Sequence, residues 1–224
     1  MFSRIVSCYD LLNRVLSFGC DRLWRARLAK AARPGSTGRI LDLAAGTLDV
    51  ALALRARYPD IIVPAVDFCL PMLHKGCSKL LRNNQERILP IAGDATCLPL
   101  SDASVDSLTM AFGIRNIRNR HAAFAEMLRV LAPGGLACIL EFGSSRERIW
   151  GGMYNFYLAC LIPGLGKLIS GDNGAYGYLA RTIRDFPTAA DLEEELRNAG
   201  FARTRFERIF SGIVCLHIAE KARY

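Results

Sequence analysis

The sequence predicts an α/β fold, in which a seven-stranded, mostly parallel sheet ends in an antiparallel hairpin. Three observations lead to this expectation. Short apolar runs alternate with stretches of helical periodicity through residues 39–142, which is typical of parallel strands joined by helices. Only Ser211-Gly212 separates the last two apolar runs, as in a hairpin. The chain has 224 residues, 51% of them hydrophobic, which suits one domain with an ordinary core.

The first four elements come from alternating strand and helix patterns. Residues 39–43 form a short apolar run, so we expect a strand there. A turn with a glycine follows, and residues 47–58 have the apolar spacing of a helix. Residues 61–67 are the next strand, and residues 71–81 the next helix.

The middle of the chain continues the same alternation. Apolar runs at residues 87–92 and 105–112 indicate two further strands. Residues 121–131 have helical periodicity, and Pro133-Gly134-Gly135 is expected to end that helix. Residues 136–142 form the fifth strand.

The end of the chain departs from the alternation. Thr188 is expected to cap a helix that ends at Gly200, and strands at residues 203–210 and 213–219 form the hairpin. A parallel sheet with this ending is the Rossmann-like layout of class I methyltransferases. We expect one domain with four parts: an N-terminal helical cap (1–38), a cofactor-binding core (39–143), an apolar substrate-side segment (144–187), and the C-terminal helix and hairpin (188–224).

Charge and hydrophobicity are unevenly distributed along the chain. The formal charge is +8, and residues 1–40 hold eight Lys and Arg and two acids, a net charge of +6. Apolar residues recur there at helical spacing, which predicts basic amphipathic helices. Such helices can rest on an anionic membrane or be an ordinary solvated face. Residues 149–166 contain no charge, and we interpret that segment as a helix and turn that walls an apolar pocket or contacts lipid, with a core helix as the alternative.

The cysteine pattern favours a reducing compartment. None of the eight cysteines forms a CxxC pair or has a histidine at zinc-ligand spacing, so we expect no metal site. We interpret the cysteines as small buried hydrophobic residues of a cytoplasmic protein. The N-terminus shows no apolar core with a cleavage site, so no signal peptide is expected.

Polar residues follow the first three strands, at the edge where ligands bind in such sheets. Asp42 and Gly46 lie at the end of the first strand, where a glycine allows close approach of the backbone. Asp67 ends the second strand and can accept bonds from two ribose hydroxyls. Asp94 follows the third and can meet an exocyclic amine. Acids at strand ends are often helix caps, but the ordered set favours a nucleoside-bearing cofactor.

Several motifs resemble the ubiquinone/menaquinone-biosynthesis C-methyltransferase family, almost from end to end of the chain. Two of them are specific: Tyr9-Asp10-Leu11-Leu12-Asn13, and Ala111-Phe112-Gly113-Ile114-Arg115-Asn116. The other matching residues are Ser17-Phe18-Gly19, Trp24, Leu41-Asp42-Leu43-Ala44, Gly46-Thr47, Asp49, Arg129-Val130-Leu131, Pro133-Gly134-Gly135, Leu140-Glu141-Phe142, Tyr176, Tyr178-Leu179, Ile183, Phe186-Pro187, Gly212-Ile213-Val214 and Leu216-His217.

The resemblance implies that S-adenosylmethionine (SAM) is bound. Gly46 and Thr47 would line the methionine and ribose end of the cofactor, Asp67 the ribose, and Asp94 and Ala95 the adenine. The implied substrate is a prenylated quinol, and the implied reaction is methylation of a ring carbon in respiratory quinone biosynthesis. Peripheral contact with an anionic membrane and a homodimer are further expectations.

Four positions depart from the family pattern. The family usually has glycine where this chain has Ala45 and Leu48, often serine at Ala111, and an acid at Arg181. If the Leu48 side chain points into the site, SAM affinity should be low, and glycine there should raise it. If φ is negative there, leucine is tolerated.

The chemistry calls for a reduced ring, because an oxidised quinone carbon cannot attack a sulfonium methyl. The expected catalytic residues are Arg115 and Asn116, past the fourth strand, with Tyr9 as a partner from the cap. A guanidinium is no base, but it can hold a phenolate or polarise a water. Alternatively, Arg115 and Asn116 only order their loop.

The three histidines are weaker candidates for this chemistry. His74 and His121 lie on expected helices and should be at the surface. His217 lies late in the last strand, where a core position is more common than a pocket position.

Three other functions remain open at this stage. The chain could methylate another small apolar aromatic, or it could be a non-catalytic SAM- or quinone-binding accessory protein, because Leu48 replaces a motif glycine. Nucleic-acid methylation is disfavoured, since the chain has no Asn/Asp-Pro-Pro-Tyr or nucleophilic cysteine motif and its basic pI of about 9.3 is non-specific.

Overall fold

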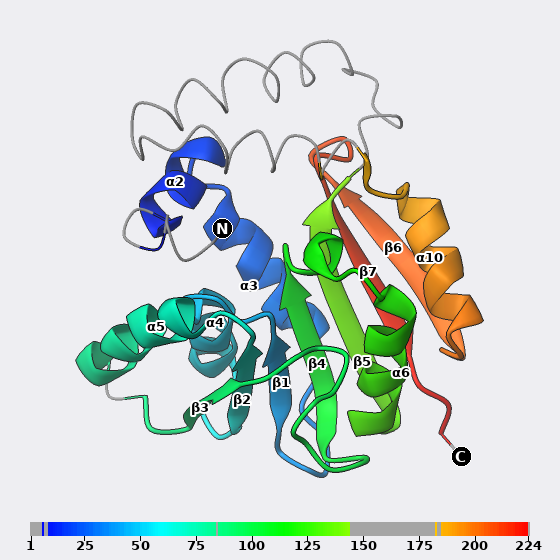
Figure 1. Ribbon diagram of the computed structural model, residues 1–224, viewed down its shortest axis with the longest axis horizontal. Coiled ribbons are helices and arrows are strands. Elements are labelled where there is room, and N and C mark those ends of the chain that lie inside the picture. The colour runs from blue at the N-terminus through cyan, green and yellow to red at the C-terminus, as the bar shows by residue number, and fades with distance from the viewer. Residues whose placement is uncertain (1–5, 7–8, 84, 144–181, 183–184, 224) are drawn as a thin grey trace.

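A single seven-stranded sheet forms the centre of the computed structural model, which describes residues 6, 9–83, 85–143, 182 and 185–223. The strand order is β3-β2-β1-β4-β5-β7-β6, so β3 and β6 are the two edges (Figure 1). The strands are β1 (Ile40–Leu43), β2 (Val63–Asp67), β3 (Ile88–Ala92), β4 (Val105–Ala111), β5 (Leu131–Phe142), β6 (Arg203–Ile209) and β7 (Val214–Glu220).

The pairing of the strands confirms the predicted fold class. The pairs β1–β2, β1–β4, β2–β3 and β4–β5 are parallel, whereas β7 is antiparallel to both β5 and β6. Because parallel strands all point the same way, the residues that follow β1 to β5 lie along one side of the sheet, at the carboxyl ends of the strands.

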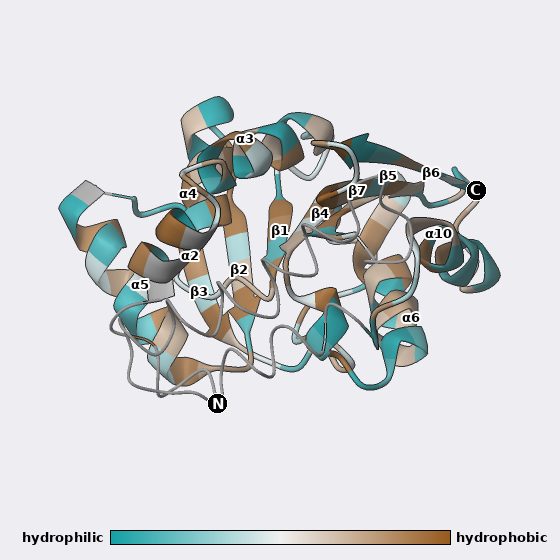
Figure 2. Ribbon diagram, turned by 90° about the horizontal axis from the view of Figure 1, so that it is seen from above, coloured by the Kyte–Doolittle hydropathy of each residue, from teal (hydrophilic) through white to brown (hydrophobic). Residues whose placement is uncertain are grey.

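Helices cover both faces of the sheet (Figure 2). They are α2 (Tyr9–Leu16), α3 (Asp21–Ala31), α4 (Asp49–Arg57), α5 (Leu70–Asn83), α6 (Arg120–Val130) and α10 (Ala189–Asn198), with a short 3-10 turn η1 (Ile114–Asn116). Strand side chains alternate between two cores: Ile40 packs with α3, α4 and α5, and Leu41 with α6 and α10. The central strands are therefore buried on both sides, as parallel sheets require, whereas the edge strands β3 and β6 are partly exposed.

Two local signals in the sequence act as expected. The Thr188 side chain accepts from the Asp191 N–H, and the Asp191 carboxylate accepts from the Thr188 N–H, so a capping box begins α10. The β6–β7 hairpin turns at residues 210–213, around Ser211 and Gly212.

The start of β5 differs from the prediction. The strand begins at Leu131 and includes Pro133-Gly134-Gly135, although a strand beginning at residue 136 was expected. The Gly134 N–H donates to the Ala222 carbonyl (3.0 Å), and the register with β4 shifts between Val105 and Ser107. The backbone of the motif therefore finds partners beyond its own turn, and it forms an irregular part of β5 in which Gly134 has a φ of +74°.

The cap and the apolar segment are described only in part. Helices α2 and α3 lie within the stretch predicted as a cap, residues 1–38, and α3 buries Trp24 and Leu28 in the core beside α4. The uncharged segment at 149–166 and Arg181 lie outside the described residues. No helix among the described residues is long and apolar enough to span a bilayer.

Candidate active site

The loop after β1 is joined to the end of β2 through Asp67. The Gly46 N–H and the Cys69 N–H each donate to one carboxylate oxygen of Asp67, both at 2.7 Å. Burial raises the pKa of the Asp67 carboxyl, and the two backbone bonds oppose that rise. The structure thus brings together Gly46 and Asp67, which the sequence placed at one site.

Gly46 has the backbone conformation and the free space that a bound ligand needs. Its φ is +53°, a value that favours glycine. No described atom lies within 4 Å of the position where a Cβ would stand. A ligand can therefore approach this part of the loop closely, and the loop fits the nucleoside-bearing cofactor expected there.

Asp42 lies beneath the loop. Its carboxylate accepts from the Ala51 N–H (3.0 Å) and from the Thr109 hydroxyl (3.3 Å), and only 1% of the residue is exposed. Burial raises the pKa of Asp42 to about 8, because the two bonds only partly offset the loss of water. Asp42 therefore holds the first turn of α4 in place below the loop, and direct contact with a cofactor stays a prediction.

The end of β3 supplies the third segment of the expected site. Asp94 is exposed and accepts from the N–H and the hydroxyl of Thr96, both at 2.8 Å, and these bonds lower its pKa. Ala95 is half-buried beside it. Since Asp67 pairs with Ala92 across β2 and β3, Asp94 lies at the same sheet edge as Asp67.

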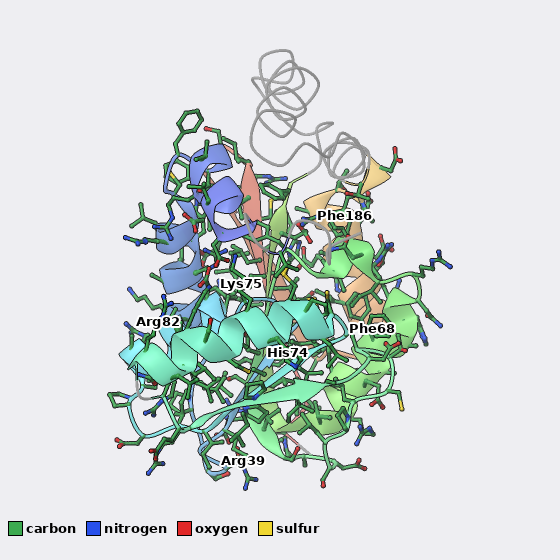
Figure 3. All side chains as sticks on the ribbon, turned by 60° about the vertical axis from the view of Figure 1, so that its left-hand side comes forward. Arg39, Phe68, His74, Lys75, Arg82 and Phe186 are labelled. Atoms are coloured by element: carbon green, nitrogen blue, oxygen red, sulfur yellow. The ribbon has the colours of Figure 1, made fainter. Side chains whose placement is uncertain are left out.

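Phe68 is a site candidate that the sequence reasoning missed. It directly follows Asp67 and is 83% exposed, at the start of α5 (Figure 3). An aromatic ring exposed at this edge can stack on a flat heterocycle. The signal in the sequence was an apolar residue after a strand-end acid, which alone does not separate core from surface.

Leu48 corrects the expectation that its side chain enters the site. It is 0% exposed, and a Cβ placed on Gly76 of α5 would lie only 2.5 Å from its Cγ. The side chain therefore packs against α5. Its φ is +66°, so leucine is tolerated here without the negative φ that we expected to be necessary. A glycine on α5 makes room for leucine in a left-handed position.

Arg115 lies in η1, directly beyond β4, and is held by Glu141 of β5. The guanidinium forms an ion pair with the Glu141 carboxylate, with side-chain exposures of 8% and 1%. It also stands over the Phe142 ring, 5.3 Å from the centroid. Burial raises the pKa of Glu141, and the charge and bonds of Arg115 oppose the rise.

The Nε–H of Arg115 is buried and, among the described residues, has no acceptor. A buried donor without a partner is costly, so an oxygen of a bound ligand that accepts from this Nε–H would be favourable. Asn116 is half-buried and makes a long contact of 3.4 Å from its Nδ2 to the Phe112 carbonyl. A catalytic role for Arg115 and Asn116 and a role in ordering their loop are both compatible with these contacts.

Aromatic rings gather beside Arg115, between α3 and the ends of β4 and β5. The Phe112 and Phe142 centroids are 4.7 Å apart, and Trp24 stands 6.1 Å and 6.4 Å from them. Phe210 of the β6–β7 turn lies 6.3 Å from Trp24 and is 53% exposed. The cluster gives this end of the site an apolar, aromatic wall.

The structure places the three histidines and Cys97, but it leaves the role of Tyr9 a prediction. Tyr9 begins α2, but its side chain lies outside the described part of the structure. His74 and His121 are exposed, as expected. His217 is 2% exposed and its Nε2 lies 3.0 Å from the Ala189 carbonyl, which confirms the core position. Cys97 is exposed, so the interpretation of every cysteine as buried is wrong there.

Two acids that the sequence reasoning did not select have contacts at the site. Glu141 holds Arg115, and Asp10 of α2 accepts from the Thr47 hydroxyl at 2.6 Å. Thr47 itself is 3% exposed. Both acids lie inside motifs of the resemblance, but only the fold shows which side chains they meet.

Known proteins match this sequence over nearly its whole length. The sequence profile of the ubiE/COQ5 methyltransferase family matches residues 1–221. The demethylmenaquinone methyltransferase of Thermus thermophilus is 41% identical over 221 residues, which cover 99% of this chain and 100% of that protein. The ubiquinone/menaquinone biosynthesis C-methyltransferase UbiE of Geobacter sulfurreducens is 40% identical, with 99% and 87% covered.

A solved structure shows the same fold at low identity. The SAM-dependent methyltransferase of Thermotoga maritima matches with a TM-score of 0.68 and 19% identity, covering 98% of this chain and 97% of that one. At this identity the likeness concerns the fold alone.

Proposed function

The chain belongs to the ubiE/COQ5 methyltransferase family, and from this premise we propose that it methylates a ring carbon of a reduced prenylated quinol, with SAM as the methyl donor. The substrate is demethylmenaquinol or a related ubiquinone precursor, as the names of its relatives suggest. The observation that best supports this is the buried Arg115–Glu141 pair, which lies at the same side of the sheet as the contact between Gly46 and Asp67.

The chain's own residues would divide the work as follows. Gly46, Thr47, Asp67, Asp94 and Ala95 would hold the cofactor, with Asp42 fixing α4 below them. Bound SAM supplies an electrophilic methyl group. Transfer of that methyl to the ring carbon would leave S-adenosylhomocysteine, and the displaced ring proton would pass to water through the polar groups around the ring.

Arg115 is suited to hold the oxygen of the quinol. Loss of the phenolic proton pushes electron density onto the ring, and the buried guanidinium stabilises the resulting phenolate. Its Nε–H is a donor without a described acceptor, and Glu141 fixes its orientation. Asn116 and Tyr9 would act as additional polar partners, and the aromatic cluster would contact the ring.

The test is methyl transfer from labelled SAM to a short-chain demethylmenaquinol, with mass analysis of the product. We expect turnover with the quinol and none with the quinone when no reductant is present, because the oxidised ring is electrophilic. Equal turnover of the quinone would contradict the mechanism. Arg115→Lys keeps the charge but loses the planar fork, so it should lower kcat with little effect on SAM affinity.

The same assay separates the two alternatives. Methylation of simple hydroquinones but not of prenylated quinols would indicate another small aromatic substrate. SAM binding without any transfer would indicate an accessory protein. That alternative depended on Leu48, and the burial of this side chain against Gly76 removes its main support.

We further propose that the protein works in the cytoplasm and contacts an anionic membrane through its cap. Large apolar side chains are exposed on α2, after it, on α3 and in the β6–β7 turn: Leu11 (57%), Phe18 (84%), Leu23 (65%) and Phe210 (53%). Residues 1–40 carry a net charge of +6, which an anionic surface attracts and salt screens.

Vesicle sedimentation tests this contact. The protein should bind anionic vesicles at low salt and leave them at high salt. Phe18→Ser with Leu23→Ser should weaken binding and slow turnover of long-tailed quinols more than of short-tailed ones. Leu81→Ser is the matched control, because Leu81 is 86% exposed on α5, outside the cap. No binding at low salt would leave the cap as a solvated face.

A further inference from the structure

Asp10 joins the cap to the loop that follows β1. One carboxylate oxygen accepts from the Thr47 hydroxyl (2.6 Å), and the other lies 3.0 Å from Nζ of Lys79 on α5. Lys75, one turn earlier on α5, is 3.7 Å from the same oxygen and also donates to the Val6 carbonyl (2.5 Å). Figure 3 shows Lys75 on the side of α5 that faces the cap.

The contact continues into the helices below. Lys79 also pairs with Asp49 at the start of α4 (2.6 Å), and Asp49 lies 3.5 Å from Arg25 of α3. Arg25 in turn forms an ion pair with Asp21. One network of charges therefore connects both cap helices with α4, α5 and the loop.

The Asp10 carboxylate is held in its charged form by these partners. Burial alone would raise its pKa, but the bonds from Thr47 and Lys79 and the charges of the two lysines outweigh burial and lower it. The side chains of Asp10 and Lys79 are 26% and 22% exposed, so water screens the pair only in part.

We propose that Asp10 and Lys79 are positioning residues that fasten the cap onto the cofactor-binding loop, so that cap closure and retention of the cofactor product are coupled. The proposal rests on the proposed function in one respect, because it takes Thr47 to lie at the methionine end of SAM. A cap fastened to Thr47 covers that end and must release before the product leaves.

Coupling of this kind is reciprocal. If the closed cap strengthens binding of the cofactor, then bound cofactor must strengthen closure by the same factor. Breaking the Asp10 contacts should therefore speed dissociation of S-adenosylhomocysteine, since opening no longer requires the network to break. The cofactor's own contacts at Asp67 and Asp94 would be unchanged.

The experiment measures the affinity and the dissociation rate of S-adenosylhomocysteine in single and double variants. Asp10→Asn and Lys79→Gln should each raise the dissociation rate at least threefold. The double variant should be affected less than the sum of the two single effects, because both changes break the Asp10–Lys79 contact, while Lys79→Gln also breaks the contact with Asp49. Lys79→Arg keeps the charge and should restore most of the retention.

The matched control is Arg27→Gln. Arg27 pairs with Glu207 at 2.9 Å and also ties the cap to the sheet, through α3 and β6, but away from the loop. The unfolding midpoint of Arg27→Gln is measured beside that of Asp10→Asn, and its dissociation rate should be unchanged. This comparison separates fastening of the loop from general loss of cap stability.

The outcomes divide clearly. Unchanged dissociation in Asp10→Asn and Lys79→Gln, with normal binding in the unmodified protein, overturns the proposal and leaves the proposed function intact. Equal acceleration in Arg27→Gln also overturns it, because any loosening of the cap would then suffice. No binding of S-adenosylhomocysteine by the unmodified protein would instead contradict the proposed function.

Discussion

Replacing Leu48 with glycine tests the most unusual backbone position next to the site. Leu48 is fully buried, so removing its side chain should cost about 2–5 kcal/mol of unfolding free energy, the range for buried leucines cut to alanine. Relief of the left-handed backbone at φ +66° returns about 1–2 kcal/mol. The greater freedom of glycine in the unfolded chain costs about 0.5–1 kcal/mol more. We expect a net loss of roughly 0.5–5 kcal/mol.

A second substitution makes the test specific to the packing. In the unmodified protein, Gly76→Ala would place a Cβ 2.5 Å from Cγ of Leu48, and such overpacking costs about 1–3 kcal/mol. In Leu48→Gly the same methyl enters vacated space, and alanine is also the better helix former by about 1 kcal/mol. The double variant should therefore be more stable than the sum of the single effects predicts.

Urea unfolding gives the stabilities, and calorimetry gives the affinity for S-adenosylhomocysteine. Because the side chain faces α5, the affinity of Leu48→Gly should stay within about twofold of the unmodified protein, which is within about 0.4 kcal/mol. A tenfold gain in affinity would refute the reasoning, since it would mean that the side chain obstructs the site. Additive stabilities in the double variant would refute the packing of Leu48 against Gly76.

Three further predictions concern buried or half-buried acids. Asp67→Ala removes the acceptor of two backbone donors and of the proposed ribose bonds, so SAM affinity measured by calorimetry should fall at least tenfold, at about 1.5–3 kcal/mol per lost bond to a charged group; unchanged affinity would remove Asp67 from the site. Asp42 holds its proton in the folded protein up to a pH of about 8, whereas the unfolded chain loses it near 3.8. Stability should therefore fall as pH rises through that window, by at most about 1.4 kcal/mol per pH unit, and Asp42→Asn should remove this part of the fall in urea titrations at pH 5, 7 and 9. A parallel fall in both proteins would contradict it. Glu141→Ala leaves the buried Arg115 charge without its partner, so the free energy of unfolding should fall by about 3–5 kcal/mol and kcat should fall as well. Glu141→Gln should have smaller effects on both quantities. Equal effects of alanine and glutamine would argue against the ion pair.

The order of elements could be predicted because each element has its own local signal. The apolar runs gave the strands, and the Thr188 cap and the Ser211-Gly212 turn gave the ends of the last helix and the hairpin. The inclusion of Pro133-Gly134-Gly135 in β5 was missed because the Gly134 N–H finds its partner in the Ala222 carbonyl, far along the chain. A local rule for proline and glycine contains no information about such a partner.

The part of the site that lies at the ends of the strands could be predicted from the sequence. Asp67 and Gly46 were placed together because parallel strands end at one edge, and their contact follows. Leu48 could not be read correctly, since its direction depends on a missing side chain at Gly76. The pairs Asp10–Thr47 and Arg115–Glu141 join residues from different elements, and no periodic pattern relates them.

The two edge strands limit how copies of this protein can associate. An exposed strand edge invites another chain to extend the sheet, and proteins guard against this with proline and with charged side chains. At one edge, β3 contains Pro90, which has no N–H to offer a neighbour. At the other, β6 displays the exposed side chains of Arg203, Arg205 and Arg208, which would repel the same strand of a second copy. Both edges therefore disfavour association through a continuous sheet, and the concentrated protein should resist strand-to-strand aggregation.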